Sequence, residues 1–171
     1  MRFFVARMRQ QGFSIIEVII ATLILTVGIL GVAGLQVVSL QQNHRSLLRS
    51  EALQIGNDML DRMRANPTQT YAPILYAADP VSSAMNCVAV ACTPAQMAVY
   101  DIAQWKCGID PIDPSSSLPF AICTTFGKTV TVLPEGEGQI QLAAGVHSVF
   151  VRWVDDRDGN TASIELYTRA D

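Results

Sequence analysis

An uncharged apolar run near the start of the chain, residues 18–35, most constrains what this sequence can fold into. Its 18 residues are about enough to span a bilayer, because a helical residue advances about 1.5 Å and the hydrocarbon core is about 30 Å thick. Glu17 directly precedes the run. An ionised carboxylate inside a membrane segment costs on the order of 3 kcal/mol and needs a partner. We therefore predict a membrane-spanning helix whose one charge is functional.

The remaining composition leaves room for one modest folded domain among the 171 residues. Beyond Gly12 the chain carries nine basic residues against fifteen acidic ones. A domain this acidic lacks the basic surface expected of a general nucleic-acid binder, so no nucleic-acid partner is predicted.

Basic residues and cysteines agree on the orientation of the chain in the membrane. Arg2, Arg7 and Arg9 precede the apolar run, so the positive-inside rule places the N-terminus in the cytoplasm and the C-terminal domain in the periplasm. The four cysteines all follow the membrane segment, and an even number suits an oxidising compartment: Cys87, Cys92, Cys107 and Cys123. We predict a single-pass protein of the inner membrane.

Residues 1–12 form a short basic leader. A secretory signal peptide is the ordinary interpretation of such a start. Its apolar region is usually about 7 to 15 residues long, shorter than this run, and carries no acid such as Glu17. A plain single-pass anchor with a polar residue near the interface is the other simple interpretation.

The segment from Gly12 to Glu17 resembles the prepilin cleavage motif of type IV pilins and type II secretion pseudopilins. It has glycine, then Phe13, an apolar pair, and glutamate at the fifth position after the glycine; Ser14 replaces the common threonine. The resemblance implies that a prepilin peptidase cuts between Gly12 and Phe13 and N-methylates Phe13. Glu17 would then pair with the new amino group, in its own chain or in a neighbouring subunit.

We predict one helix over residues 13–66, about 80 Å long, with a membrane-spanning half at about residues 15–38. An apolar stripe continues beyond the bilayer at spacings of three and four: Leu48, Ala52, Ile55, Met59 and Met63. Asn66 and Pro67 end the helix, because proline disfavours helical geometry in the residue before it.

Three glycines, Gly28, Gly31 and Gly34, recur at every third residue of the apolar run. They form either a close-packing face in the membrane or the ordinary glycine content of membrane helices.

Two further stretches, residues 27–36 and 61–67, look like those of the PilV-type minor pilins. Residues 61–67 also read simply as a solvated helix end capped by proline. The resemblance implies a pilin-like α+β fold, in which the long N-terminal helix packs on a C-terminal antiparallel β-sheet.

Residues 67–171 form the predicted extracytoplasmic domain. Residues 68–119 read as a long irregular connection with a short helix near residues 94–104. Proximity favours the disulfides Cys87–Cys92 and Cys107–Cys123 among three pairings. A zinc site is the alternative, but the cysteine spacings do not match it, and no metal is predicted.

The C-terminal part reads as four strands, at residues 128–133, 139–142, 146–154 and 161–169. Residues 134–138 are predicted as a turn. In the third strand Val149, Val151 and Trp153 share one face. Residues 155–160 fit either a calcium loop or a hairpin turn, and Asp158-Gly159 favours the turn.

The only two histidines, His44 and His147, lie in no nucleophile motif, and the chain has no phosphate-binding loop. We therefore predict no enzyme and no cofactor. The resemblance implies a minor pilin that acts in type IV pilus assembly, priming or modification, with other pilins and the prepilin peptidase as partners. A minor pseudopilin of a type II secretion system and a membrane-anchored periplasmic binding or enzymatic domain are the alternatives.

Overall fold

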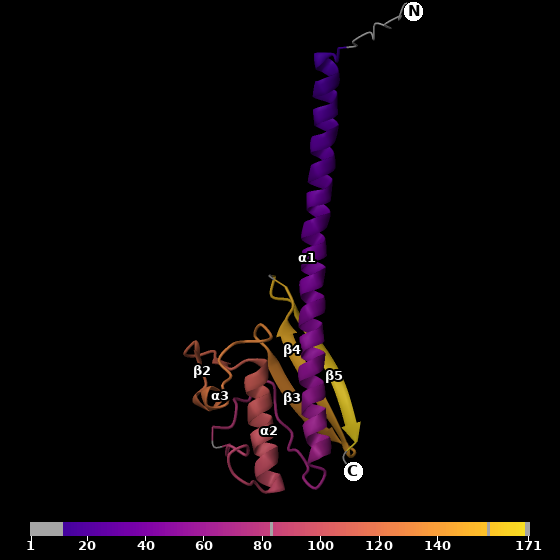
Figure 1. Ribbon diagram of the computed structural model, residues 1–171. Helices are drawn as coiled ribbons and strands as arrows, with labels where there is room; N and C mark the ends of the chain where they lie inside the picture. The colour runs from indigo at the N-terminus through magenta and orange to yellow at the C-terminus, as the bar shows by residue number, and fades with distance from the viewer. Residues whose placement is uncertain (1–11, 83, 157, 170–171) are drawn as a thin grey trace, which may run out of the picture. The chain divides into compact units, whose positions relative to one another are not determined.

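The computed structural model describes residues 12–82, 84–156 and 158–169, so most of the leader lies outside the described residues. The chain divides into two compact units, Met1–Asn43 and His44–Asp171. The secondary structure is α+β, with a long N-terminal helix followed by a small antiparallel sheet, as predicted (Figure 1).

The helix α1 (Ile15–Ala65) begins within the predicted cleavage motif, two residues after Phe13. The amides of Glu17 and Val18 donate to the Ser14 carbonyl at 3.1 and 3.3 Å, which starts the helical hydrogen bonding. It ends one residue before Asn66-Pro67, as expected from the proline. The long helix predicted from the sequence is therefore confirmed, with slightly later bounds at its start.

In the second unit, one stripe of α1 belongs to the hydrophobic core. The buried members are Leu48, Ala52, Gly56, Met59, Leu60 and Met63. Ile55, predicted in this stripe, is only partly buried and packs at the margin of the core. Gly56 was not anticipated: a Cβ there would lie 2.6 Å from Leu166 Cδ1, so glycine lets the sheet approach the helix closely.

The sheet has three strands in the order β3-β4-β5: β3 (Glu137–Ala143), β4 (Val146–Val154) and β5 (Thr161–Arg169). Ala144 and Gly145, at φ 50° and 75°, form the two-residue turn between β3 and β4. On β4, alternate residues are buried, and they are His147, Val149, Val151 and Trp153. The predicted inner face of this strand is therefore confirmed, with His147 added to it.

The strand predicted at residues 128–133 is wrong, because this segment is irregular. The amides of Val132 and Leu133 both donate to the Ile109 carbonyl at 3.3 Å, and Leu133 is fully buried. The segment therefore packs against the end of a helix instead of joining the sheet.

The turn predicted at residues 134–138 is also too long, since β3 already begins at Glu137. The surroundings of Gly138 explain why β3 contains a glycine at this position. A Cβ at this position would overlap the Trp105 ring and lie 2.6 Å from Ile109 Cδ1. Glycine thus permits close approach of β3 to a helix.

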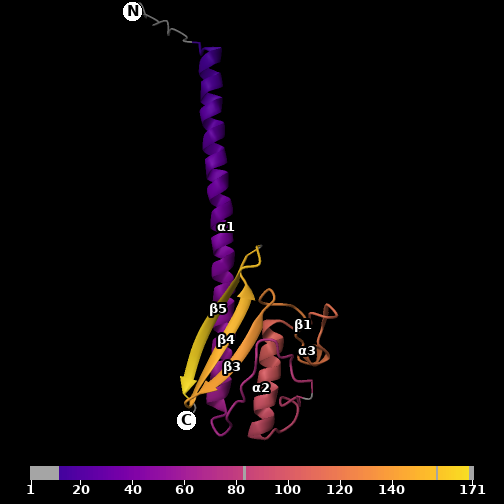
Figure 2. The ribbon, with the colours of Figure 1, turned by 180° about the vertical axis from the view of Figure 1, so that it is seen from behind.

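That helix is α2 (Pro94–Ile109), which is longer than the predicted segment 94–104. Thr93 and Gln96 form a reciprocal capping box at its start. Figure 2 shows α2 beside the β3 edge of the sheet and β5 at the opposite edge. The short helix α3 (Ala121–Thr125) and the paired strands β1 (Ile112–Asp113) and β2 (Leu118–Pro119) were not predicted.

Both predicted disulfides are present, with Cα–Cα distances of 5.5 Å for Cys87–Cys92 and 5.2 Å for Cys107–Cys123. Cys107 and Cys123 are fully buried and link α2 to α3. The cysteines are consequently not available as zinc ligands.

Polar side chains fasten α2 to α1. Arg62 donates to Asp101 at 3.1 Å and to Gln104 at 2.6 Å, while the Tyr71 hydroxyl donates to the other Asp101 oxygen at 2.6 Å. The Trp105 indole donates to the Ile55 carbonyl at 3.0 Å. Burial, and then the hydrogen bond to Asp101, raise the pKa of Tyr71.

We predict that Gly138→Ala lowers the free energy of unfolding by about 1–3 kcal/mol, because the added methyl group must displace the packed Trp105 and Ile109 side chains. Gly108→Ala is the matched control. Gly108 lies in α2, and no atom lies within 4 Å of a Cβ added there, so alanine should raise stability by up to about 1 kcal/mol. Chemical unfolding of the full chain in detergent checks both; equal stability of the two variants would contradict the packing argument.

Lys106 makes stability depend on pH. Its ammonium is buried and donates to the Leu75 and Tyr76 carbonyls at 3.0 and 2.8 Å. Burial lowers its pKa from 10.5 to about 8, although the charges of Glu137 and Asp79 act the other way. Between these values the unfolded chain binds a proton that the folded chain has released, so stability rises with pH.

We predict that the free energy of unfolding rises by about 2 kcal/mol between pH 8 and pH 10. Lys106→Met should remove this rise. The raised pKa of Tyr71 acts in the opposite direction only above its ordinary value of 10.0, so the measurement ends at pH 10. The same slope in the wild type and in Lys106→Met would show that another group causes it.

Candidate functional site

The candidate processing site lies at the start of the described chain. Gly12, Phe13 and Ser14 have no regular secondary structure and are exposed, and the Phe13 side chain is 84% exposed. A peptidase needs an accessible bond, and the residues on both sides of the Gly12–Phe13 bond are exposed; cleavage there stays a prediction. The sequence expectation put Phe13 within the helix, but α1 begins two residues later.

Glu17 lies in the first turn of α1, with its side chain exposed. The amides at a helix N-terminus carry a partial positive charge, which favours a carboxylate there. The next ionisable residue along the helix is His44, so Glu17 is the one acid on this stretch of α1. An amino group brought close to the first turn would therefore meet one carboxylate in otherwise apolar surroundings.

After Glu17, residues 18–35 of the helix are apolar on all sides apart from two threonines. Large side chains on every face are exposed, including Ile16, Leu23, Ile24, Leu30 and Leu35. Two polar residues, Thr22 and Thr26, donate their hydroxyls to the Ile19 and Leu23 carbonyls at 2.9 and 2.8 Å. With these hydroxyls satisfied inside the helix, its surface suits lipid or other apolar helices. The helix is long and apolar enough to cross a membrane.

Gly28, Gly31 and Gly34 lie in the same stretch, and no atom lies within 4 Å of a Cβ added to any of them. Their backbone is therefore open to close approach by another helix. Their role as a packing face stays a prediction.

The loop at residues 155–160 joins β4 to β5, which confirms the hairpin interpretation. The Asp156 carboxylate accepts from the amides of Asp158 and Asn160 at 3.0 and 3.1 Å, and Gly159 has φ 79°. Arg45 on α1 donates to the same carboxylate at 3.1 Å. Across the described parts of the chain, no three Asp, Glu, His or Cys side chains are grouped to hold a metal ion.

The two histidines lie apart. His44 is exposed on α1, whereas His147 is buried in β4, with Nε2 at 3.2 Å from the Tyr71 carbonyl oxygen. Since a carbonyl only accepts, Nε2 carries a proton. Neither histidine has the nucleophile partner that general-base catalysis requires among the contacts of the described residues.

Sequence reasoning missed the role of residues 61–67, whose simple interpretation is a solvated helix end. Arg62 is partly buried and bonded to Asp101 on α2, and Asn66 donates to the Pro94 carbonyl at 2.9 Å. The sequence feature that could have predicted this contact is Asp101, the first charged residue after an uncharged stretch at residues 80–100. When such an isolated acid is buried, it is normally paired with a cation from elsewhere in the chain.

Comparison with family models gives two adjoining matches. The model described as prokaryotic N-terminal methylation motif matches residues 7–33, which include Gly12, Phe13 and Glu17. The model described as type IV pilin Tt1218 matches residues 34–103, which include the second half of α1 and most of α2. Searches of curated proteins and of solved structures found no match.

The two matched regions follow each other without a gap, with the methylation motif on the N-terminal side. The described structure adds an apolar helix of sufficient length to cross a membrane and an antiparallel sheet after it. The chain belongs to the type IV pilin family.

Proposed function

We propose that the chain is a minor type IV pilin of the PilV kind, which acts in pilus assembly, priming or modification. The observation that carries this proposal is the exposed Gly12–Phe13 bond shortly before a helix in which Glu17 is followed by the uncharged, exposed apolar residues 18–35. Such a segment needs an apolar environment both before and after assembly. A membrane and a bundle of identical or related helices supply the two environments.

Before assembly the protein is held in the inner membrane, with its N-terminus in the cytoplasm and residues 67–171 in the periplasm. The basic residues of the leader support this orientation by the positive-inside rule. The disulfides Cys87–Cys92 and Cys107–Cys123 suit the oxidising periplasm.

Processing then changes the charge at the start of the helix. A prepilin peptidase cuts between Gly12 and Phe13 and methylates the new amino group of Phe13. This amino group is positively charged near neutral pH, and Glu17 is the one acid between Phe13 and His44. In the low dielectric of a helix bundle the attraction between the two is strong enough to set the register between subunits.

The assignment to the PilV kind rests on residues 27–36 and 61–67. In the second of these, Arg62 and Asn66 bond to Asp101 and to the start of α2, so the motif fixes the domain to its helix. The proposed partners are other major and minor pilins, contacted through the apolar part of α1.

The test is complementation of a strain that lacks this protein. We predict that the deletion removes surface pili and twitching and that the wild-type chain restores them. Glu17→Ala should be cleaved but recovered in sheared pili at least about tenfold less than wild type, since an unpaired amino group in an apolar bundle costs more than about 1.4 kcal/mol. Thr22→Val, which removes a polar group from the same helix, is the matched control and should assemble normally.

Different outcomes contradict different parts of this proposal. Normal recovery of Glu17→Ala in pili would overturn the register role of Glu17. Intact pili with lost protein export in the deletion strain would identify a pseudopilin of a type II secretion system instead.

A further inference from the structure

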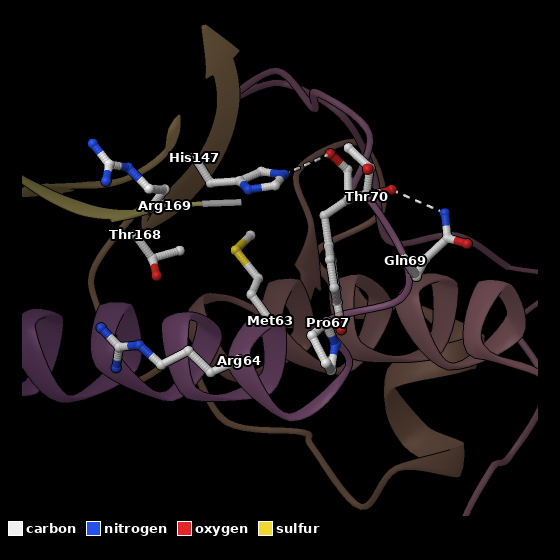
Figure 3. Close-up of a pocket in the computed structure, with 9 residues that line it drawn as sticks. Met63, Arg64, Pro67, Gln69, Thr70, His147, Thr168 and Arg169 are labelled. Atoms are coloured by element: carbon white, nitrogen blue, oxygen red, sulfur yellow. Dashed lines mark hydrogen bonds between the residues drawn. The ribbon is translucent and has the colours of Figure 1, made fainter. Parts of the chain in front are cut away.

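A cavity of about 280 Å³ lies in the second unit, where α1 ends. Three separate parts of the chain line it: the last turn of α1 with the loop that follows, the start of β4 and the end of β5. Figure 3 shows the side chains used below, which are Met63, Arg64, Pro67, His147, Thr168 and Arg169. Its volume is near the lower end of small-ligand sites.

Among the described residues that line the cavity, the two charged side chains are arginines. Arg64 comes from α1 and Arg169 from β5, and in Figure 3 both side chains extend toward the left of the view, with Thr168 between them. The described residues that line the cavity include no carboxylate, although the chain as a whole is acidic. The local charge therefore favours an anionic ligand.

Arg64 is available to such a ligand at little cost. Its one ion pair within the described chain joins it to Asp61 at 2.7 Å, and the two side chains are 56% and 70% exposed. An exposed pair of this kind contributes little to stability, because water and salt screen it. A guanidinium also binds a carboxylate through two parallel hydrogen bonds.

The other lining residues give the cavity an apolar part and a fixed polar wall. The apolar part of the wall is formed by the thioether of Met63, which is otherwise buried, and by the ring carbons of Pro67. His147 is held in place by its hydrogen bond to the Tyr71 carbonyl, and Thr168 adds a hydroxyl. An alkyl stem would contact Met63 while its carboxylate reached the arginines.

We propose that this cavity binds a carboxylate on a short alkyl stem, as in the side chain of glutamate or in a small dicarboxylic acid. Arg64 and Arg169 bind the carboxylate, and Met63 and Pro67 contact the stem. This inference is independent of the proposed role in a pilus, because it depends only on the second unit.

The test is a titration of the full chain in detergent, observed by the methyl NMR signals of its methionines. Glutarate is the probe, and glutaramide, which has the same shape without charge, is the control ligand. We expect the Met63 signal, assigned with Met63→Leu, to shift saturably with glutarate and not with glutaramide. Met59 is buried but does not line the cavity, so its signal should stay in place.

Arg64→Gln and Arg169→Gln should each weaken glutarate binding by at least about fivefold, since each removes a charge-assisted hydrogen bond. Arg49→Gln removes the same charge from an exposed position on α1 outside the cavity and should leave the affinity unchanged within about twofold. Thermal unfolding checks that all three variants are folded.

A second titration separates the two sources of the carboxylate. A short peptide with one glutamate, compared with its glutamine counterpart, should bind more tightly than glutarate if the ligand is a side chain of another protein, and more weakly if it is a free acid. No saturable shift of Met63, equal binding of glutaramide, or an equal effect of Arg49→Gln would each overturn the proposal.

Discussion

The structure depends first on a helix surface that water cannot solvate favourably. Between Glu17 and His44 the helix α1 carries no ionisable side chain, and its large apolar residues are exposed on every face. Such a helix requires lipid or other apolar helices around it. One carboxylate in these surroundings is costly unless a cation meets it. Cleavage before Phe13 would produce that cation four residues away from Glu17. Processing, anchoring and assembly would then all depend on the same requirement, a cationic partner for Glu17 in apolar surroundings.

The second half of the same helix has a different role. In the second unit, Leu48, Ala52, Met59 and Met63 belong to a core shared with the sheet, and Gly56 lets β5 lie against the helix. Arg62 and Trp105 then hold α2 to α1 through hydrogen bonds. Substitutions in this half are therefore expected to act on the stability of the domain, whereas substitutions in the apolar half are expected to act on the membrane and on assembly.

Much of this fold follows from local patterns in the sequence. The long apolar run, the three- and four-residue spacing beyond it and the alternation in residues 146–154 predicted α1 and the inner face of β4. Non-local contacts decided the rest. Residues 128–133 have strand-like composition, but two of their amides, those of Val132 and Leu133, donate to the Ile109 carbonyl instead of to a strand. Neither the pairing of Arg62 with Asp101 nor the closeness of Gly138 to Trp105 leaves a periodic signal. The cavity between Arg64 and Arg169 likewise depends on segments far apart in the chain.

The intact mass of the chain recovered from sheared pili is the most direct measurement of processing and assembly together. A chain that begins at Phe13 and carries the mass of one added methyl group, present in sheared pili, agrees with cleavage after Gly12 followed by insertion into the filament. A chain found only in the membrane fraction with residues 1–12 still attached, in cells whose other pilins are processed, would contradict it.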